Sequence, residues 1–422
     1  MKQDYRPLTP VRRTSEAITP LTPLTPKKMK LTVYRKKLIG ALEACQKARA
    51  SWNWCHSRQI NYAFSCYIFR TEASGFVDII TTNTEWCIKK SFHANITDFE
   101  KRTFAIPADR LVEVLKSLDD EYVTIQILHT QIRIMHACGE FSLPMVNNPE
   151  EVIQLAEDLL NMKTDAAVEA VETPFLVSAI KRCNDFTAKD NLRPSLCGVC
   201  INSTENHTDI VSSDGNKLMR IRRKPISETP FQTIIPAETA KHLPKLLPNT
   251  GDVDLFIQPY SDKKDAPAPV CIIKTLDTEI AVKTVDRRYP NYNLVIPKSV
   301  KYEAKVSKNL LTKTIKRINM LSPFVKADAD ITFEPNLMKA KYQEGDIAEE
   351  YGVKETVACQ YSGEKMEIRF RIHLLQSCIR NIATSNVRIG LNGPHDSAII
   401  MPDPPAADEE LITLSMPLYK GE

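Results

Sequence analysis

The chain has 422 residues, of which 43% are hydrophobic and 26% are charged, a balance typical of a globular protein with about two to four domains. The net charge of +4 and the pI of about 8.4 are mildly basic and neither indicate nor exclude a nucleic-acid partner, so the placement of the charges has to decide. No apolar run approaches the ~20 residues that span a bilayer, and the N-terminus lacks the apolar core of a signal peptide. We therefore expect a cytoplasmic protein without membrane contact, whose eleven cysteines are reduced thiols.

Residues 1–28 predict a disordered tail rich in Thr-Pro pairs, which begin at Thr9, Thr19, Thr22 and Thr25. Proline disfavours helix in the residue before it and supplies no amide proton. Basic residues flank the pairs, so an arm that touches nucleic acid is one interpretation. A solvated extension is the simpler one.

From Met29 onward a unit of about 120 residues recurs three times. Each unit opens with a short strand and an amphipathic helix whose apolar residues follow i, i+4, i+7, the spacing of one helical face. These residues are Leu38, Leu42 and Cys45, then Leu176, Ile180 and Cys183, then Leu311, Ile315 and Ile318.

A second helix is predicted in each unit, over residues 106–118, 235–247 and 370–382. Alternating apolar and polar residues follow each of these helices and predict strands with one buried face. The fold class is therefore α+β, with each repeated unit made of two helices packed on antiparallel sheets. The predicted domains are 29–148, 171–297 and 298–422, with 149–170 as a helical linker or insertion.

Basic residues gather on the first helix of every unit, whereas many acids lie in loops. Such a helical surface would meet DNA phosphates without reading bases. The alternative is that these faces are merely solvated, and their recurrence in all three units favours DNA. The predicted DNA-facing residues are Arg35, Lys36, Lys181, Arg182, Lys189, Lys313, Lys316 and Arg317.

Common catalytic and nucleotide-binding motifs are missing from the sequence, which predicts a protein without enzymatic activity, cofactor or metal. Cys197 and Cys200 form a C-x-x-C pair, but no second pair or histidine cluster accompanies it. Residues 212–215, Ser-Ser-Asp-Gly, are interpreted as a hairpin turn and not as a nucleophile site.

Several segments together resemble the β subunit of bacterial DNA polymerase III, the β sliding clamp. The opening MKLTVYRKKLIGALEAC is similar to the family's first strand and helix. DIVSSDGNKLMRI is similar to its middle-domain hairpin, and VDRRYPNYNLVIPK to the end of its second domain. YSGEKMEIRFRIHLLQSCI and the terminal ITLSMPLYKGE resemble its third domain, so the resemblance covers about nine-tenths of the chain.

The resemblance implies three DNA-clamp domains per chain and a head-to-tail homodimer that closes into a ring around duplex DNA. It implies a processivity factor that binds a replicative polymerase, a clamp loader and other DNA-processing proteins through short linear motifs. The partner cleft would be formed by Leu196, Ser213, Gly215, Asn216, Lys217, Leu218, Pro290, Val295, Leu414, Met416, Pro417 and Leu418.

Asn216 and Lys217 replace the family's usual His and Arg, and the chain continues beyond Leu418 as Tyr-Lys-Gly-Glu. At the dimer seam, Phe141 and Leu143 match one side, and Met320 and Leu321 match the other. For all four residues, burial in the core is the alternative interpretation.

Two other functions remain open on the sequence alone. One is a divergent clamp paralogue with restricted partners, encoded by a mobile element. The other is a nucleic-acid-processing enzyme, which would need a carboxylate or metal cluster that the sequence does not display.

Overall fold

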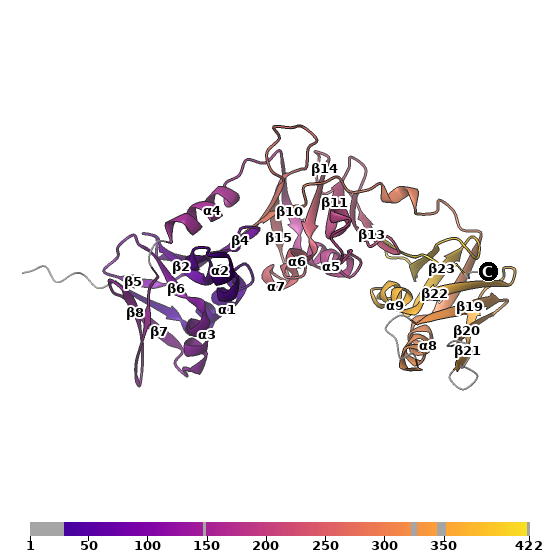
Figure 1. The fold of residues 1–422 in the computed structure, drawn as a ribbon, viewed down its shortest axis with the longest axis horizontal. Helices are drawn as coiled ribbons and strands as arrows, with labels where there is room; N and C mark the ends of the chain where they lie inside the picture. The colour runs from indigo at the N-terminus through magenta and orange to yellow at the C-terminus, as the bar shows by residue number, and fades with distance from the viewer. Residues whose placement is uncertain (1–28, 147–148, 322–326, 344–351, 420–422) are drawn as a thin grey trace, which may run out of the picture.

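The computed structural model describes residues 29–146, 149–321, 327–343 and 352–419, and the statements below concern these residues. Figure 1 shows an arch in which three units follow one another along the chain. The paired helices of each unit lie toward the concave side, and most strands lie toward the convex side. Within the described ranges, no helix has both the length and the apolar character needed to cross a bilayer.

The first unit has two runs of antiparallel strands, in the orders β5-β1-β7-β8-β9 and β6-β2-β3-β4. Helix α1 (Arg35–Cys45) packs against α3 (Ala108–Ser117) and buries the predicted Leu38, Leu42 and Cys45. The strands are β1 (Lys30–Tyr34), β2 (Cys66–Thr71), β3 (Phe76–Thr82), β4 (Trp86–His93), β5 (Asn95–Thr97), β6 (Thr103–Pro107), β7 (Tyr122–Ile127), β8 (Gln131–His136) and β9 (Gly139–Pro144). A short helix, α2 (Trp52–Arg58), and a 3-10 turn, η1 (Tyr62–Ser65), lie between α1 and β2.

The middle unit repeats this plan with the orders β10-β15-β16-β17 and β14-β11-β12-β13. Its strands are β10 (Ala166–Glu172), β11 (Gly198–Ser203), β12 (Thr208–Ser213), β13 (Lys217–Arg223), β14 (Phe231–Pro236), β15 (Asp252–Gln258), β16 (Val270–Lys274) and β17 (Thr278–Lys283). Its first helix is α5 (Thr173–Asn184). The second predicted helix is split into α6 (Ala237–Ala240) and α7 (Leu243–Leu246). Pro244 explains the break, because it lacks the amide proton that would continue α6.

The third unit has the orders β18-β23-β24-β25 and β22-β19-β20-β21. Helices α8 (Lys308–Leu321) and α9 (Ile372–Arg380) pack against each other. The strands are β18 (Tyr302–Ser307), β19 (Asp328–Glu334), β20 (Leu337–Gln343), β21 (Gly352–Gln360), β22 (Met366–Arg371), β23 (Asn386–Leu391), β24 (Ala398–Asp403) and β25 (Glu410–Ser415). We propose that these three units are the three domains expected from the sequence.

Neighbouring units share a sheet. Strand β4 of the first unit pairs antiparallel with β17 of the middle unit. Strand β13 of the middle unit pairs in the same way with β25 of the third. We call these pairings the first and the second junction.

The segment 149–170, expected to be a linker or insertion, contains helix α4 (Glu150–Leu160). Its last five residues are not linker, because β10 already begins at Ala166 and pairs with β15. The alternation of Ala166, Val168 and Val171 with exposed residues marks the strand and was not recognised in the sequence.

Candidate functional site

The predicted cleft residues meet at the second junction. Leu218 on β13 lies opposite Leu414 on β25, and Leu196 from the short 3-10 turn η2 (Pro194–Leu196) joins them. All three are buried, with 8% or less of each exposed. We name the apolar cluster around them the second outer cluster; its other buried members are Ala188, Cys200, Val211, Ile234, Tyr289 and Tyr292.

A tight turn forms one end of this cluster. Gly215 has φ +91°, a conformation that suits glycine, and a Cβ there would lie 2.3 Å from Nη1 of Arg193. Ser213 Oγ accepts a hydrogen bond from the Gly215 amide at 3.1 Å. Asn216 offers its carbonyl to the Met416 amide at 2.9 Å, which fixes the end of β25 beside the turn.

Lys217 is a buried cation and not a free surface charge. Its Nζ donates to the Asp185 carbonyl at 2.6 Å and lies 4.8 Å from the centre of the Phe186 ring. Burial lowers the pKa of its ammonium group, against the opposing effect of nearby Asp214 and Asp185. The residue that replaces the family's usual Arg therefore ties the turn to the end of α5.

The outer residues of the predicted cleft are more exposed than the buried cluster beneath them. Val295 is 53% exposed and Met416 is 40% exposed, and Pro290 is exposed as well. Pro417 is buried where it bridges to Phe370, and the half-buried Leu418 donates its amide to the Arg369 carbonyl at 2.8 Å. A partner would therefore meet an exposed apolar rim above a closed apolar floor.

Sequence reasoning missed the polar support beneath this floor. Asp209 is fully buried and accepts two hydrogen bonds from Arg222, at 2.7 and 2.8 Å. Its Oδ2 also accepts from the Tyr292 hydroxyl at 2.7 Å. Burial, followed by the charge of Asp209, raises the pKa of that hydroxyl. Tyr292 stands in the segment VDRRYPNYNLVIPK quoted above, so its presence was noted but its contact with Asp209 was not.

Three of the predicted DNA-facing arginines form contacts within the protein. Arg35 donates to the carbonyl of Leu115 in the last turn of α3 and to that of Asp120 beyond the helix. Arg182 forms two hydrogen bonds with Glu409 of the third unit, at 2.7 and 2.9 Å. Arg317 pairs with Glu355 on β21.

The predicted lysines behave differently from these arginines. Lys36, Lys181, Lys189, Lys313 and Lys316 are all exposed, and within the described ranges none of them forms an ion pair. Three further exposed lysines, which are not among the predicted DNA-facing residues, lie on or beside helices at the first junction. They are Lys47, Lys241 and Lys245.

At the predicted dimer seam, Phe141 is 38% exposed and Met320 is 81% exposed, so the core interpretation is wrong for both. Leu143 is half-buried and packs against the main core. Leu321 is the last residue of α8, and its side chain lies outside the described residues.

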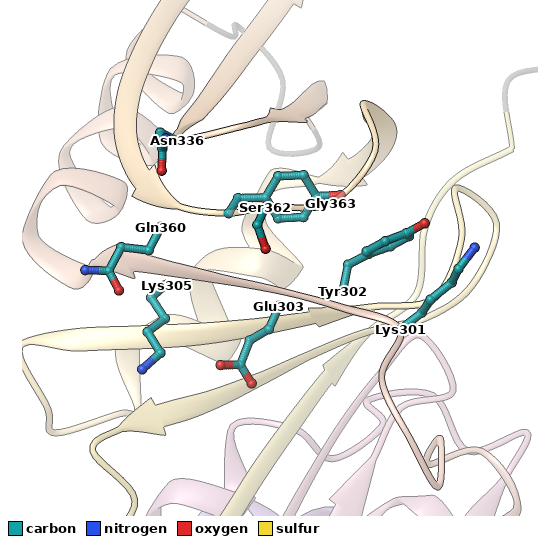
Figure 2. A pocket seen from close by; sticks show the side chains of 9 residues that line it. Lys301, Tyr302, Glu303, Lys305, Asn336, Gln360, Ser362 and Gly363 are labelled. Carbon is teal, nitrogen blue, oxygen red and sulfur yellow. The ribbon is translucent and has the colours of Figure 1, made fainter.

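A separate cavity of about 380 Å³ lies where β18 parts from β21, lined by Lys301, Tyr302, Glu303 and Gln360 among others (Figure 2). None of its lining residues belongs to the predicted cleft. In the part of the chain that the structure describes, no three His, Cys, Asp or Glu side chains are grouped to hold a metal ion. Cys197 lies at the end of η2 and donates its thiol to the Asp190 carbonyl.

Comparison with known proteins agrees with this architecture. Residues 293–419 match the family model of the DNA polymerase III beta subunit, C-terminal domain. The Synechococcus elongatus beta sliding clamp is 20% identical over 75% of this chain and 81% of its own length. The beta subunit from the DNA polymerase of Streptococcus pyogenes superposes with a TM-score of 0.81 at 16% identity, covering 93% of this chain and all of that one.

This chain is similar in sequence and in fold to the bacterial β sliding clamps. The solved structures show the clamp fold, with its mixture of helices and antiparallel sheets. The Helicobacter pylori beta clamp, bound to a DNA ligase peptide, has a TM-score of 0.78 at 16% identity. These relatives support the clamp interpretation and not the paralogue or enzyme alternatives.

Proposed function

We propose that this protein is a DNA sliding clamp, a processivity factor that encircles duplex DNA and tethers a replicative polymerase and other DNA-processing proteins. The observation that carries the proposal is the arch of three repeated units, joined through shared sheets, with helices toward its concave side. From its similarity to the clamps, we infer that the protein is a non-catalytic accessory subunit of DNA polymerase. We place it in the cytoplasm, where bacterial DNA is replicated.

The repeat itself suggests how a second copy closes the ring. At each junction, an edge strand of one unit pairs with an edge strand of the next unit. These pairs are β4 with β17 and β13 with β25. Strand β21 of the third unit holds the place of β4 and β13, and β9 of the first unit holds the place of β17 and β25. Within the described residues, these two strands have no such partner in another unit. Strand β21 meets β18 at only two positions, and the described partner of β9 is β8. Head-to-tail pairing of β21 with β9 of a second copy would form a closed homodimer.

The exposed lysines fit a partner that is bound through its phosphates without recognition of its bases. Exposed ammonium groups on several helices meet phosphates wherever the duplex lies, and they carry no base specificity. Retention by encirclement needs no tight contact, which agrees with the small net charge. We propose Lys36, Lys181, Lys189, Lys313 and Lys316 as phosphate contacts, joined by Lys47, Lys241 and Lys245.

We propose the second junction as the cleft for short linear motifs of a polymerase, a clamp loader and other partners. Exposed Val295 and Met416 offer apolar contacts, and the turn around Gly215 offers backbone groups at the same place. A solved clamp relative binds a DNA ligase peptide, which supports this type of partner.

The experiment that tests the clamp is retention on circular DNA. The protein is loaded onto nicked circular DNA by a clamp loader, washed at high salt, and the DNA is then linearised. A sliding ring stays on the circle and is lost from the cut ends. Binding that depends on salt but not on DNA topology would contradict the proposal.

A further inference from the structure

The two junctions are equivalent position by position. Cys87 on β4 lies opposite Ala281 on β17, as Leu218 on β13 lies opposite Leu414 on β25. At the first junction the Lys283 amide donates to the Glu85 carbonyl at 2.9 Å. The Met416 amide donates to the Asn216 carbonyl at 2.9 Å in the matching place. The first junction therefore has a counterpart of the cleft.

Strand registers extend this match across the sheet. Val211 and Cys200, which lie opposite each other in the second outer cluster, correspond to Ile80 and Ile68. Ile234 corresponds to Ala105 by the pairing of the next strand. All five residues of the first junction that correspond to this cluster belong to a single apolar cluster of their own. We name it the first outer cluster; the five residues are Ile68, Ile80, Cys87, Ala105 and Ala281.

Helix α4 covers the first outer cluster. Its buried face is formed by Val152, Ala156, Leu159 and Leu160, each 5% exposed or less. The helix contacts β3 and β4 of the first unit and β17 of the middle unit, so it crosses the junction. Figure 1 shows it on the convex side of the arch.

Small residues beneath the helix explain why it fits here. Cys87 and Ala281 stand where the cleft has Leu218 and Leu414, and the smaller side chains leave room for a helix backbone. The Cys87 thiol lies 3.7 Å from the Ala156 carbonyl and donates to it. Outside this apolar contact, Glu157 pairs with Arg70, and the Asn61 amide donates to Glu151 at 3.0 Å.

We propose that α4 is a built-in occupant of a second, cleft-like apolar surface, which it closes to partner peptides while it ties the first two units together. One partner cleft per protomer then remains open, a consequence that rests on the proposed clamp function. The surface under α4 is suited to an amphipathic helix with apolar residues at i, i+4, i+7 and i+8, the spacing of the helix that fills it.

The proposal is tested by supplying the helix in trans. Residues 150–162 are replaced by a Gly-Ser segment of equal length, and a labelled synthetic peptide of residues 149–162 is titrated by fluorescence anisotropy. We expect saturable one-to-one binding to this variant and none to the full chain. A peptide with Ala156→Asp should not bind, whereas the matched Leu155→Asp peptide should, because Leu155 is 43% exposed.

Alkylation of Cys87 in the full chain provides a second measurement. Burial raises the pKa of the Cys87 thiol to about 12, so it should react slowly near neutral pH. Leu160→Ala should accelerate its labelling more than about tenfold, whereas Leu155→Ala should not. Buried Cys271 and Cys200 should stay protected in both variants.

A replacement variant that keeps Cys271 and Cys200 protected but fails to bind the peptide would overturn the proposal. So would unchanged labelling of Cys87 in Leu160→Ala. Neither readout needs DNA, a loader or a dimer. Failure of the clamp function itself would appear only in the circular-DNA experiment.

Discussion

At the scale of single residues, basic side chains on one helix can have separate tasks. Lys181 and Arg182 are neighbours on α5, yet Lys181 is exposed while Arg182 reaches Glu409 in the third unit. A planar guanidinium can hold a carboxylate with two hydrogen bonds, whereas an ammonium group acts as a compact point charge. In this chain three of the predicted arginines form contacts within the protein, whereas the exposed lysines are the proposed phosphate contacts.

Replacing Lys313 and Lys316 by Ala should weaken binding to duplex DNA and make it less dependent on salt. Each lost phosphate contact should reduce the slope of log affinity against log salt by about 0.9. Fluorescence anisotropy at several salt concentrations measures this slope. Arg182→Ala serves as the control and should leave the slope unchanged. An equal loss in Arg182→Ala would place its guanidinium on the DNA path after all.

Two changes at the cleft should separate its floor from its rim. Leu414→Ala removes a side chain that is 2% exposed and should lower the free energy of unfolding by about 2–5 kcal/mol. Met416→Ala trims a side chain that is 40% exposed and should cost less than about 0.5 kcal/mol. Met416→Ala should nevertheless weaken a polymerase-motif peptide measurably in calorimetry. Unchanged affinity would show that the peptide binds at another site.

At the scale of elements, the helices were the easiest to predict. Residues at i, i+4 and i+7, such as Leu176, Ile180 and Cys183, are local signals, and α5 buries all three. The pairing of β4 with β17 joins residues about 190 positions apart, and no local pattern encodes it. The partner of Arg182 was hidden for the same reason, since Glu409 lies 227 positions away. The contact of Lys217 with Asp185, 32 positions away, likewise has no local pattern.

The first junction should weaken in acid. Lys89 donates to Glu279 at 2.8 Å and Lys90 to Asp277 at 2.7 Å, both across the junction. Burial alone would raise the pKa of each carboxyl, but the lysine hydrogen bonds outweigh it and lower the pKa. Their stabilising effect is therefore complete above the ordinary pKa values of 3.8 and 4.5 and is lost as pH falls through the lower folded values.

Hydrogen exchange of β4 and β17 amides between pH 6 and 3, corrected for intrinsic rates, measures this loss. The variant Glu279→Gln should show a smaller pH dependence than the parent protein. Amides at the second junction provide the comparison within the same molecule. If Glu279→Gln follows the parent curve, the Lys89 pair does not contribute.

At the scale of the whole molecule, the repeat predicted more than any single motif. Three units, two helices per unit and basic first helices were all visible in the sequence. The resemblance to the clamp family added the prediction that the units form a ring. The break at Pro244 was not foreseen, although the proline that causes it stands in the sequence. The contacts of α4 were not foreseen because they depend on how distant segments pack.

Phe141→Asp should convert the proposed dimer into a monomer. The side chain is 38% exposed on β9, and a carboxylate there would be buried against β21 of the second copy. Light scattering coupled to size exclusion measures the mass. Phe99→Asp is the matched control, since Phe99 is 42% exposed and lies outside the proposed seam. A dimer that survives Phe141→Asp would exclude β9 from the interface.

The identical registers of β4 with β17 and β13 with β25 have a directional consequence. Each unit is joined to the preceding one by the same strand pairing, so all units point the same way around a closed ring. The two faces of such a ring therefore differ from each other. The turn at Gly215 and the end of β25 lie side by side and would stand on one side of such a ring. A partner held there would always approach the duplex from the same side. The ring would therefore orient the proteins bound to it in one direction along the DNA.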